Sequence, residues 1–280
     1  MTAPVSAPSA DAGFVDSRPA HGRRPGQASD RRRTRSFPPL RGLLPLGLLL
    51  GLWQLLGSAA SPYFPPPSTW IGGLQRLWEN GSLRPAAGET LVTFALSLVA
   101  ATVLGSLLGI VVGASKKVDR ALGPTLEFAR AMPPAAMVPI AALLIGYGET
   151  MKVAVVTFAA VWPVLLNARA GVRALDPVLV DAARSLHLNW FDTVRKCIAP
   201  ALAPAVLLGV RVAAPMALVI TLLVEIVTRV GGLGGLIALG QRNYLSAQVY
   251  GTILVAGLFS FLVNGVVAAL EGAAFRHRPR

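Results

Sequence analysis

The chain has 280 residues, of which 54% are hydrophobic and only 14% charged, and its mean hydropathy is +0.59. Soluble globular proteins carry about 25% charged residues, so this composition excludes an ordinary water-soluble domain and indicates a membrane protein. A single cysteine, Cys197, excludes a disulfide framework within the chain. The three histidines show no HExxH or other metal-ligand spacing, which argues against a catalytic metal centre. A net charge of +13 would suit binding to nucleic acid. The interpretation depends on where the charges lie along the chain.

Six stretches are long and apolar enough to cross the roughly 30 Å hydrocarbon core of a bilayer, which takes about 20 residues. They are residues 43–60, 91–114, 131–147, 153–170, 201–227 and 249–270. The third is short and rich in proline, and an earlier start at Leu122 would bring Glu127 and Arg130 into it. The sequence therefore predicts an all-α integral membrane protein with about six transmembrane helices.

The basic residues are distributed unevenly between the two sides of these spans. With a cytoplasmic N-terminus, 20 of the 26 Lys and Arg residues fall inside, 5 fall outside, and Arg211 lies within a span. Such a bias toward the cytoplasm sets the orientation of membrane proteins, so both termini are predicted to be cytoplasmic. The positive charge then faces the headgroups of membrane lipids, and nucleic acid is not an expected partner.

The N-terminal residues 1–40 are rich in Ala, Pro, Ser, Gly and Arg and lack apolar periodicity, which predicts a disordered, basic cytoplasmic tail. The membrane domain is predicted to span residues 41–272, and residues 273–280 form a second basic tail. The Arg-rich run 31–37 before an apolar stretch also resembles a twin-arginine export signal. Five later spans favour a membrane anchor with its positive charge inside over a processed signal.

Prolines and regularly spaced apolar residues predict the local structure after the first span. The prolines at 65–67 force an extended backbone there. The next segment, residues 68–78, has apolar residues at helical spacing, two of them tryptophans, which predicts an interfacial helix. In the second span Gly105, Gly109 and Gly113 recur every four residues, and this predicts a surface where another helix approaches closely.

The run Gly231-Gly232-Leu233-Gly234-Gly235 superficially resembles a phosphate-binding loop, but it lacks the Gly-Lys-Ser/Thr ending of a P-loop. It also falls on the outer side of the predicted topology, so we interpret it as a tight re-entry loop. No nucleophile–base constellation appears elsewhere. The chain is therefore expected to carry no ATPase site and to bind no cofactor of its own.

The longest inner connection, residues 171–200, lies between the fourth and fifth spans and is too polar to enter lipid. Asp176 precedes a proline at a first helical position, and Asn189 begins a second capping pattern, so two short helices are predicted. Pro200 is expected to end the second helix before span five. Such a helical hairpin either docks a cytosolic partner or rests on the headgroups as an amphipathic connector, and the pattern alone leaves both interpretations open.

Within this connection, the triplet 181–183, His187 and the triplet 198–200 resemble the cytoplasmic EAA loop of binding-protein-dependent ABC importer permeases. Further motifs resemble the branch of that family that handles nitrate, sulfonates, taurine and related small anions. They stand in matching order at residues 64–67, 130–134, 138–140, 146–149, 162–167, 171–173, 209–211 and 232–234. The resemblance runs from about Leu40 to the C-terminus.

The resemblance implies a permease subunit, not an enzyme, in the plasma (inner) membrane of a bacterium. Its implied partners are a cytosolic ABC ATPase dimer that binds the ATP, an extracytoplasmic substrate-binding protein, and a second permease copy, identical or closely related. A short helix and turn of the inner connection would seat in a cleft of one ATPase and carry its motion into the spans. The ATPase-coupling residues implied in this way are Asp181, Ala182, Ala183, Leu186, His187 and Pro200.

Three departures from the family pattern bear on this coupling. Asp181 replaces the usual Glu and shortens the reach by one methylene, and Ala199 stands where Leu is usual. His187 stands where the family has Gly, at a position expected to need a positive φ, which His adopts at a cost. These departures fit either a matched partner ATPase or a divergent subunit.

Two charged residues lie within the predicted fifth span. Arg211 and Glu225 are 14 residues apart, which places both on one helix face. Intramembrane charges mark solute pathways, so this face is predicted to border the translocation path, with Asn167 and Pro163 of the fourth span as further candidates. The alternative is that each charge is satisfied by a neighbouring helix or by headgroups.

The leading hypothesis is thus an ABC importer permease for a small anion such as a sulfonate, taurine or nitrate. A self-sufficient secondary carrier would favour inverted repeats with broken helices, and the sequence contains no convincing internal repeat. A permease for a heterocycle that resembles a thiamine precursor is a further alternative within the same branch. An intramembrane enzyme lacks the paired acids or histidine cluster that it would need.

Overall fold

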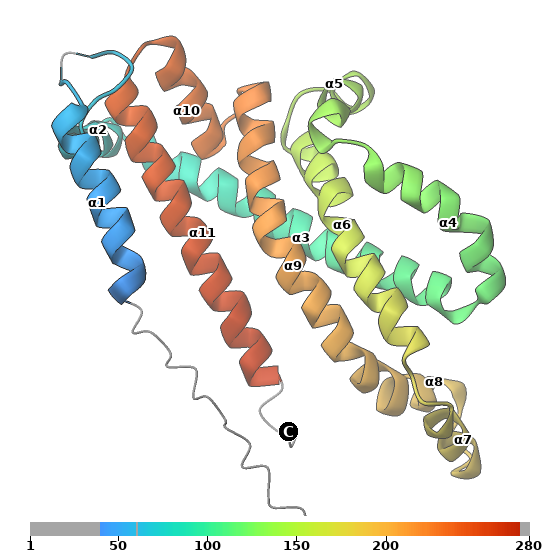
Figure 1. Cartoon of the computed structure of the whole chain (residues 1–280). Coiled ribbons are helices and arrows are strands. Elements are labelled where there is room, and N and C mark those ends of the chain that lie inside the picture. The colour runs from blue at the N-terminus through green and yellow to red at the C-terminus, as the bar shows by residue number, and fades with distance from the viewer. Residues whose placement is uncertain (1–39, 60, 275–280) are drawn as a thin grey trace, which may run out of the picture. The chain divides into compact units, whose positions relative to one another are not determined.

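A computed structural model describes residues 40–59 and 61–274 (Figure 1), and all regular structure in these ranges is helical. The helices are α1 (Leu40–Leu56), α2 (Ser68–Glu79), α3 (Leu83–Ala114), α4 (Lys116–Ala131), α5 (Pro134–Ile145), α6 (Glu149–Arg173), α7 (Pro177–Ser185), α8 (Trp190–Asp192), the π-helix η1 (Thr193–Ile198), α9 (Ala199–Thr228), α10 (Gly232–Arg242) and α11 (Ser246–Ala274). The predicted basic tails lie almost wholly outside the described residues. From Leu46 onward the chain forms one compact unit, which is the unit considered below.

Four helices are long and apolar enough to cross a membrane. They are Leu83–Ala114, Glu149–Arg173, Trp190–Thr228 and Ser246–Ala269. The pair α4 and α5 makes a fifth candidate, although its two halves are bent by 94°. The predicted all-α membrane fold is confirmed. Among the described helices, four meet the length and hydropathy of a span, or five with the bent pair.

The predicted third span has a different form from the one expected. The chain bends where Met132 and Pro133 are extended, with ψ of 127° and 126°, because a residue that precedes proline disfavours the helical conformation. The apolar helix α5, which begins at Pro134, has only 12 residues, about 18 Å at 1.5 Å per residue. That length does not cross the hydrocarbon core, and the other half of the span is the much more polar helix α4.

The core lies where α3, α6 and α9 pack side by side, and it is built largely from small and β-branched residues. The predicted close approach at the glycines of α3 is confirmed, and the partner is α6. A Cβ placed on Gly105 would lie 2.8 Å from the Val161 carbonyl oxygen, and one on Gly109 would lie 2.5 Å from the Leu165 carbonyl oxygen. Only glycine leaves room for the two backbones at this distance.

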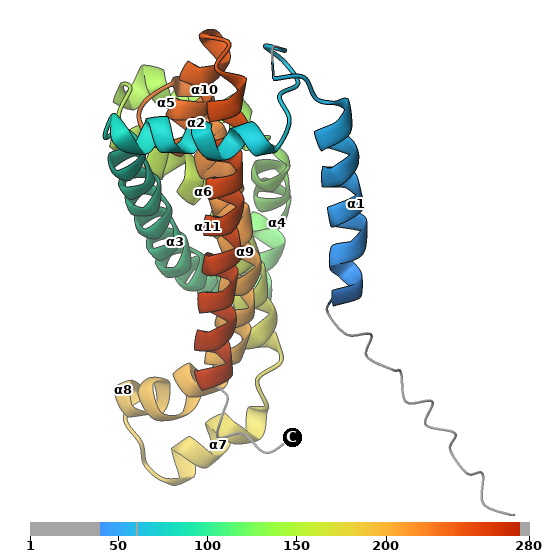
Figure 2. The ribbon, with the colours of Figure 1, turned by 90° about the vertical axis from the view of Figure 1, so that its left-hand side faces the viewer.

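The predicted helix after the prolines also forms, as α2, and Figure 2 shows it lying across the ends of α3 and α11. Gly73 of α2 meets the backbone of Ala247, where an added Cβ would lie 2.5 Å from the carbonyl oxygen. Trp70 of the same helix stacks on Tyr250 of α11, with ring centroids 5.4 Å apart. Trp53 of α1 packs edge-on against both rings. These aromatic rings fix α2 across the helix ends.

Candidate functional site

Both helix starts that the sequence predicts in the inner connection are present. The side chain of Asp176 accepts a hydrogen bond from the Val178 amide (2.9 Å), directly before α7. The side chain of Asn189 accepts one from the Asp192 amide (2.7 Å) and caps α8. Both interactions satisfy amides that a helix start leaves unpaired. The local sequence therefore determines where each short helix begins.

His187 occupies a left-handed conformation with φ of +50°, as predicted for this position. The Leu188 amide donates to the Ala183 carbonyl (3.1 Å) across the turn, which is the hydrogen bond of a Schellman motif with His187 as the residue after the cap. Glycine is the usual residue there because it has no Cβ to clash. His187 thus ends α7 in a conformation that glycine adopts without strain and histidine adopts at some cost in backbone energy.

The implied coupling residues differ in exposure. Ala183 is fully buried, whereas Asp181 and Ala182 are exposed and Leu186 is 72% exposed. Two neighbours that the sequence analysis did not select, Trp190 and Phe191, are 78% and 68% exposed. Apolar side chains exposed together on a segment too polar to enter lipid are typical of a protein contact surface. In the sequence, this contact surface is indicated by the adjacent Trp-Phe pair that follows the Asn189 cap.

Pro200 does not end a helix, and the prediction that it does is wrong. The residues Trp190–Thr228 form one continuous helix of 39 residues, in which α8, η1 and α9 follow without a break. Pro200 lacks the amide that would bond to the carbonyl four residues earlier. The π-helical turn of η1, residues 193–198, lies directly before it, and a π-bulge re-routes the backbone bonds at such a point. The helix therefore continues through the proline.

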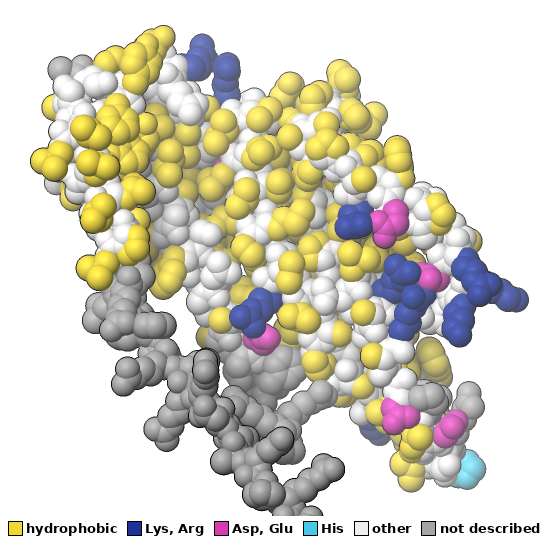
Figure 3. All heavy atoms as spheres, in the orientation of Figure 1, with side chains coloured by type: hydrophobic (Ala, Val, Ile, Leu, Met, Phe, Trp, Pro, Cys, Tyr) yellow, Lys and Arg dark blue, Asp and Glu magenta, His cyan; other side chains and the backbone are white. Residues whose placement is uncertain are grey.

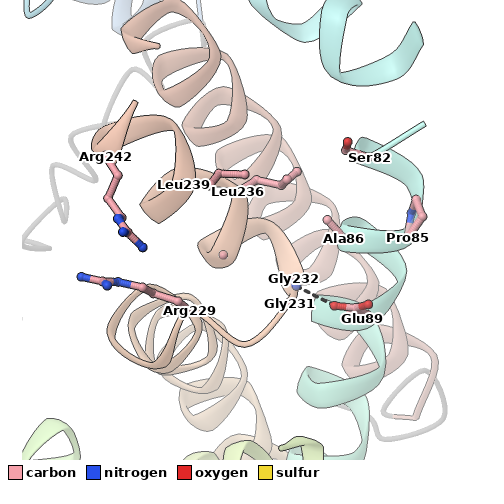
Figure 4. Close-up of a pocket in the computed structure, with 11 residues that line it drawn as sticks. Ser82, Pro85, Ala86, Glu89, Arg229, Gly231, Gly232, Leu236, Leu239 and Arg242 are labelled. Atoms are coloured by element: carbon pink, nitrogen blue, oxygen red, sulfur yellow. Dashed lines mark hydrogen bonds between the residues drawn. The ribbon is translucent and has the colours of Figure 1, made fainter. Parts of the chain in front are cut away.

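At the opposite end of α9, two carboxylates bind the glycine-rich loop. Glu225 is fully buried, and the Thr90 hydroxyl donates to its two oxygens at 3.0 and 2.9 Å. The Gly234 amide also donates to Glu225 (3.0 Å), and the Gly232 amide donates to Glu89 (2.7 Å), as Figure 4 shows for the latter pair. The Leu233 amide donates to the Thr90 hydroxyl oxygen (2.9 Å). The first three amides of α10 are thus all satisfied by α3 and α9.

This arrangement explains the glycines without a phosphate. Gly231 and Gly232 have φ of +60° and +72°, which glycine adopts without strain. A Cβ on Gly232 would lie 2.1 Å from the Glu225 carboxyl group, and one on Gly234 would lie 2.5 Å from the Glu225 Cβ. The amides and the positive end of the helix dipole, which favour any anion, are occupied by the chain's own acids. The predicted tight loop is confined to Gly231 and the residues before it, because residues 232–235 form the first turn of α10.

A cavity of about 380 Å³ lies beside this loop, between the start of α3, the end of α9 and α10. Arg229 and Arg242 extend to one side of it, away from Glu89 (Figure 4), and neither makes an ion pair with another described residue. In residues 40–59 and 61–274, no group of three or more His, Cys, Asp or Glu side chains could hold a metal ion. The cavity is thus a basic recess at one end of the helices.

The four residues predicted to border a path lie in different surroundings. Glu225 is enclosed by its own chain, whereas the exposed Arg211 pairs with Glu271 of α11 at 2.7 Å. Asn167 donates from its side-chain amide to the Pro163 carbonyl (2.8 Å). Both half-buried residues face the close contact between α6 and α9, where a Cβ on Gly209 would meet them within 3.2 Å. The structure therefore does not bring the four together.

The arrangement of long apolar helices defines a multi-pass α-helical membrane protein. Residues 101–276 match the family described as "Binding-protein-dependent transport system inner membrane component". This match covers more than half of the chain, and the chain therefore belongs to that family, as the sequence motifs indicated. It is an inner-membrane component of a bacterial transport system.

Several transport permeases are similar to this chain along most of their length. The putative aliphatic sulfonates transport permease protein SsuC of Bacillus subtilis is 27% identical over 242 residues, which cover 85% of this chain and 88% of SsuC. The taurine transport system permease protein TauC of Escherichia coli is 28% identical over 234 residues, 81% and 85% of the two chains. The bicarbonate transport system permease protein CmpB of Synechocystis is 28% identical over 254 residues, 84% and 88%.

The fold is also found in solved transporter structures. A chain of the MetNI methionine ABC transporter, in an inward-facing conformation, aligns with a TM-score of 0.61 and 16% identity over 71% of this chain and 98% of that chain. At this identity the likeness concerns the fold alone. It agrees with the family assignment and with the helical arrangement described above.

Proposed function

We propose that this chain is the membrane-spanning subunit of an ATP-driven importer and that it forms the translocation path for a small anion such as a sulfonate, taurine or nitrate. The observation that carries the proposal is the family match over residues 101–276. Similar proteins named for sulfonates, taurine, bicarbonate and nitrate support the class of solute. A self-sufficient carrier is not favoured, because the family serves binding-protein-dependent transport.

The second part of the proposal is that α7 and the turn after it dock on a separate cytosolic ATPase. The exposed carboxyl-bearing helix with Asp181 and Ala182, followed by exposed Leu186 and His187, supports this role. Small side chains let a helix enter a cleft, and a carboxylate pairs with a basic residue at its rim. The buried Ala183 holds α7 to the rest of the chain, and Pro200 lies within the long helix that leads from α7 into the membrane.

The third part concerns topology and assembly. We propose that the apolar helix α1 adds a further span, that both termini are cytoplasmic, and that residues 41–272 form the permease domain between two basic tails. A second copy of the chain, an extracytoplasmic binding protein and an ATPase dimer that binds the ATP complete the importer. Asn167, Pro163 and Arg211 stay candidates for the path. For the enclosed Glu225 the contacts support the role of holding α10.

The experiment is co-purification of the tagged chain from its native membrane in mild detergent. We expect a cytosolic ATPase to accompany the wild type and to be lost with Asp181→Arg. The matched control is Glu79→Arg, which makes the same charge change on the exposed end of α2 and should retain the ATPase. Recovery of no ATPase with the wild type, in a detergent that keeps a known importer intact, contradicts the proposal.

A further inference from the structure

The helix α4 is the least apolar of the membrane-crossing elements, and it has no buried residue. At 100° per residue, six of its positions fall within an arc of about 100°. This set, called here the α4 polar face, comprises Lys116, Asp119, Arg120, Gly123, Glu127 and Arg130. The opposite side carries Leu122 and Phe128, which are 41% and 71% exposed. The helix therefore has one side suited to lipid or protein and one side suited to water.

The α4 polar face reaches into the membrane. The helix α3 is long enough to cross the bilayer, and only Ser115 separates its last residue from the start of α4. In Figure 1 α4 runs back from that end toward α5. Arg130 lies 14 residues beyond Lys116, about 21 Å along the helix, so it falls within a hydrocarbon core roughly 30 Å thick. A charged side chain at that depth is costly in lipid and is found facing a bundle interior or a water-filled cavity.

The end of α6 extends this surface and makes it basic. Arg169 and Arg173 both pair with Asp119, the former at 2.5 Å. Lys116 and Arg120, which line a cavity of about 570 Å³ with Arg173, make no ion pair with any described residue. Figure 3 shows the Lys, Arg, Asp and Glu side chains gathered in a row across an otherwise hydrophobic surface in this region. The α4 polar face and the end of α6 together carry five cationic and two anionic side chains.

Within the row, Arg130 is the cation deepest in the membrane. It pairs with Glu127 one turn earlier, and both remain about half exposed, at 49% and 58%. An exposed ion pair of this kind contributes little to stability, so its presence is not explained by the fold. A guanidinium that keeps half its surface open offers planar, two-point recognition to an oxyanion. Glu127 is then the internal anion that occupies Arg130 when no solute does.

We propose that the solute passes along the α4 polar face and that Arg130 binds its oxyanion group within the membrane, in exchange for Glu127. This inference rests on the proposed transport function and adds the contact residue to it. The sequence contained the signal, because an early start of the third span includes both residues. The route differs from the predicted face of Arg211 and Glu225, since Glu225 is enclosed by its own chain.

The first test measures water access and needs no solute. In a Cys197→Ala background, Arg130→Cys and, as the matched control, Phe128→Cys are labelled in vesicles with a charged, membrane-impermeant thiol reagent. We expect Arg130→Cys to react at least about tenfold faster than Phe128→Cys. Equal rates would overturn the route, whatever the solute is.

The second test measures uptake by the reconstituted complex of this chain with its ATPase and binding protein, with taurine, methanesulfonate and nitrate as probes. Arg130→Gln should lower the amount of solute carried per ATP about tenfold or more, as expected for loss of a charge-assisted hydrogen bond. Arg130→Lys should recover part of it, and Glu127→Gln should carry at least as much as the wild type. The control Lys117→Gln removes a charge from the same helix outside the α4 polar face and should change nothing.

The outcomes separate the two proposals. If water reaches position 130 but the wild-type complex carries none of the probes, the proposed solute class fails and the route stands. If the wild type carries a probe and Arg130→Gln carries it equally well per ATP, the anion contact is wrong. A loss of assembled complex in both Arg130→Gln and Glu127→Gln would show that the ion pair is structural, which also overturns the contact.

Discussion

The contact between α3 and α6 at Gly109 is narrow enough that a single methyl group should open it. In Gly109→Ala, the new Cβ would lie 2.5 Å from the Leu165 carbonyl oxygen and 2.7 Å from the Ala168 Cβ. Ordinary contacts of a Cβ are 3.4–4 Å, so the two helices must separate by about 1 Å at this point. A backbone carbonyl within a helix cannot rotate away as a side chain can.

The cost follows from the contacts that the separation weakens. A gap of 0.5–1 Å forfeits a quarter to a half of each dispersion contact, which is worth about 0.15 kcal/mol. If Val164, Leu165 and Ala168, which are all buried, direct about 40 atom contacts toward α3, the loss is about 1.5–3 kcal/mol. This agrees with the 1–3 kcal/mol that overpacking commonly costs. With an unfolding entropy of about 2.1 cal/mol/K per residue over the 280 residues, it would lower the melting temperature by about 3–5 °C.

The assay is thermal unfolding in detergent, followed by the fraction of chain that still elutes as a single folded species. Gly88→Ala is the matched control because it lies on the same helix and nothing is within 4 Å of its added Cβ. The control should be neutral or slightly stabilising, since alanine favours helix over glycine by up to about 1 kcal/mol. Equal melting temperatures for the two variants would refute the packing argument.

Three further substitutions test the contacts described above. Thr90→Val should destabilise the chain by about 2–4 kcal/mol, because it removes a buried donor to Glu225 and leaves an α10 amide unpaired. The control is Thr102→Val, which removes a hydroxyl that bonds only within its own helix and should cost less than about 1 kcal/mol in the same melting assay. His187→Gly should relieve the positive φ and stabilise the turn by about 1 kcal/mol, seen as slower amide exchange at the end of α7; unchanged exchange would argue against strain there. Arg211→Gln should shift stability by no more than about 1 kcal/mol, because its ion pair is half exposed, and a larger loss on melting would show that the pair is structural.

The sequence predicted the features that depend on local chemistry. The caps at Asp176 and Asn189, the positive φ at His187 and the glycine contact surface of α3 all follow from short-range rules, and each is present. The family and the all-helical class followed from ordered motifs and from hydropathy. These signals need only a few consecutive residues or one helical period, so the rest of the fold cannot obscure them.

The features that the sequence did not reveal depend on more than the neighbouring residues. The surroundings of Glu225 were not predicted, because its burial beside Thr90, 135 residues away, leaves no trace in the sequence around it. Pro200 was expected to stop a helix because the π-turn that accommodates it is a response of the whole backbone, not of one residue type. An early start at Leu122 already brought Glu127 and Arg130 into the third span, but hydropathy carries no signal for the 94° bend between α4 and α5.

The continuity of the helix from Trp190 to Thr228 has a mechanical consequence. Its 39 residues span about 58 Å at 1.5 Å each, nearly twice the roughly 30 Å of the hydrocarbon core. One end lies beside α7, and the other holds α10 through Glu225. A displacement of a few ångströms at the first end is therefore carried toward the second, and the helix can bend on the way at the π-turn of residues 193–198 and at Pro204 and Pro215. All three points where this helix can bend lie in the two thirds of it nearer to α7, so the last turns, which hold α10, move as one piece.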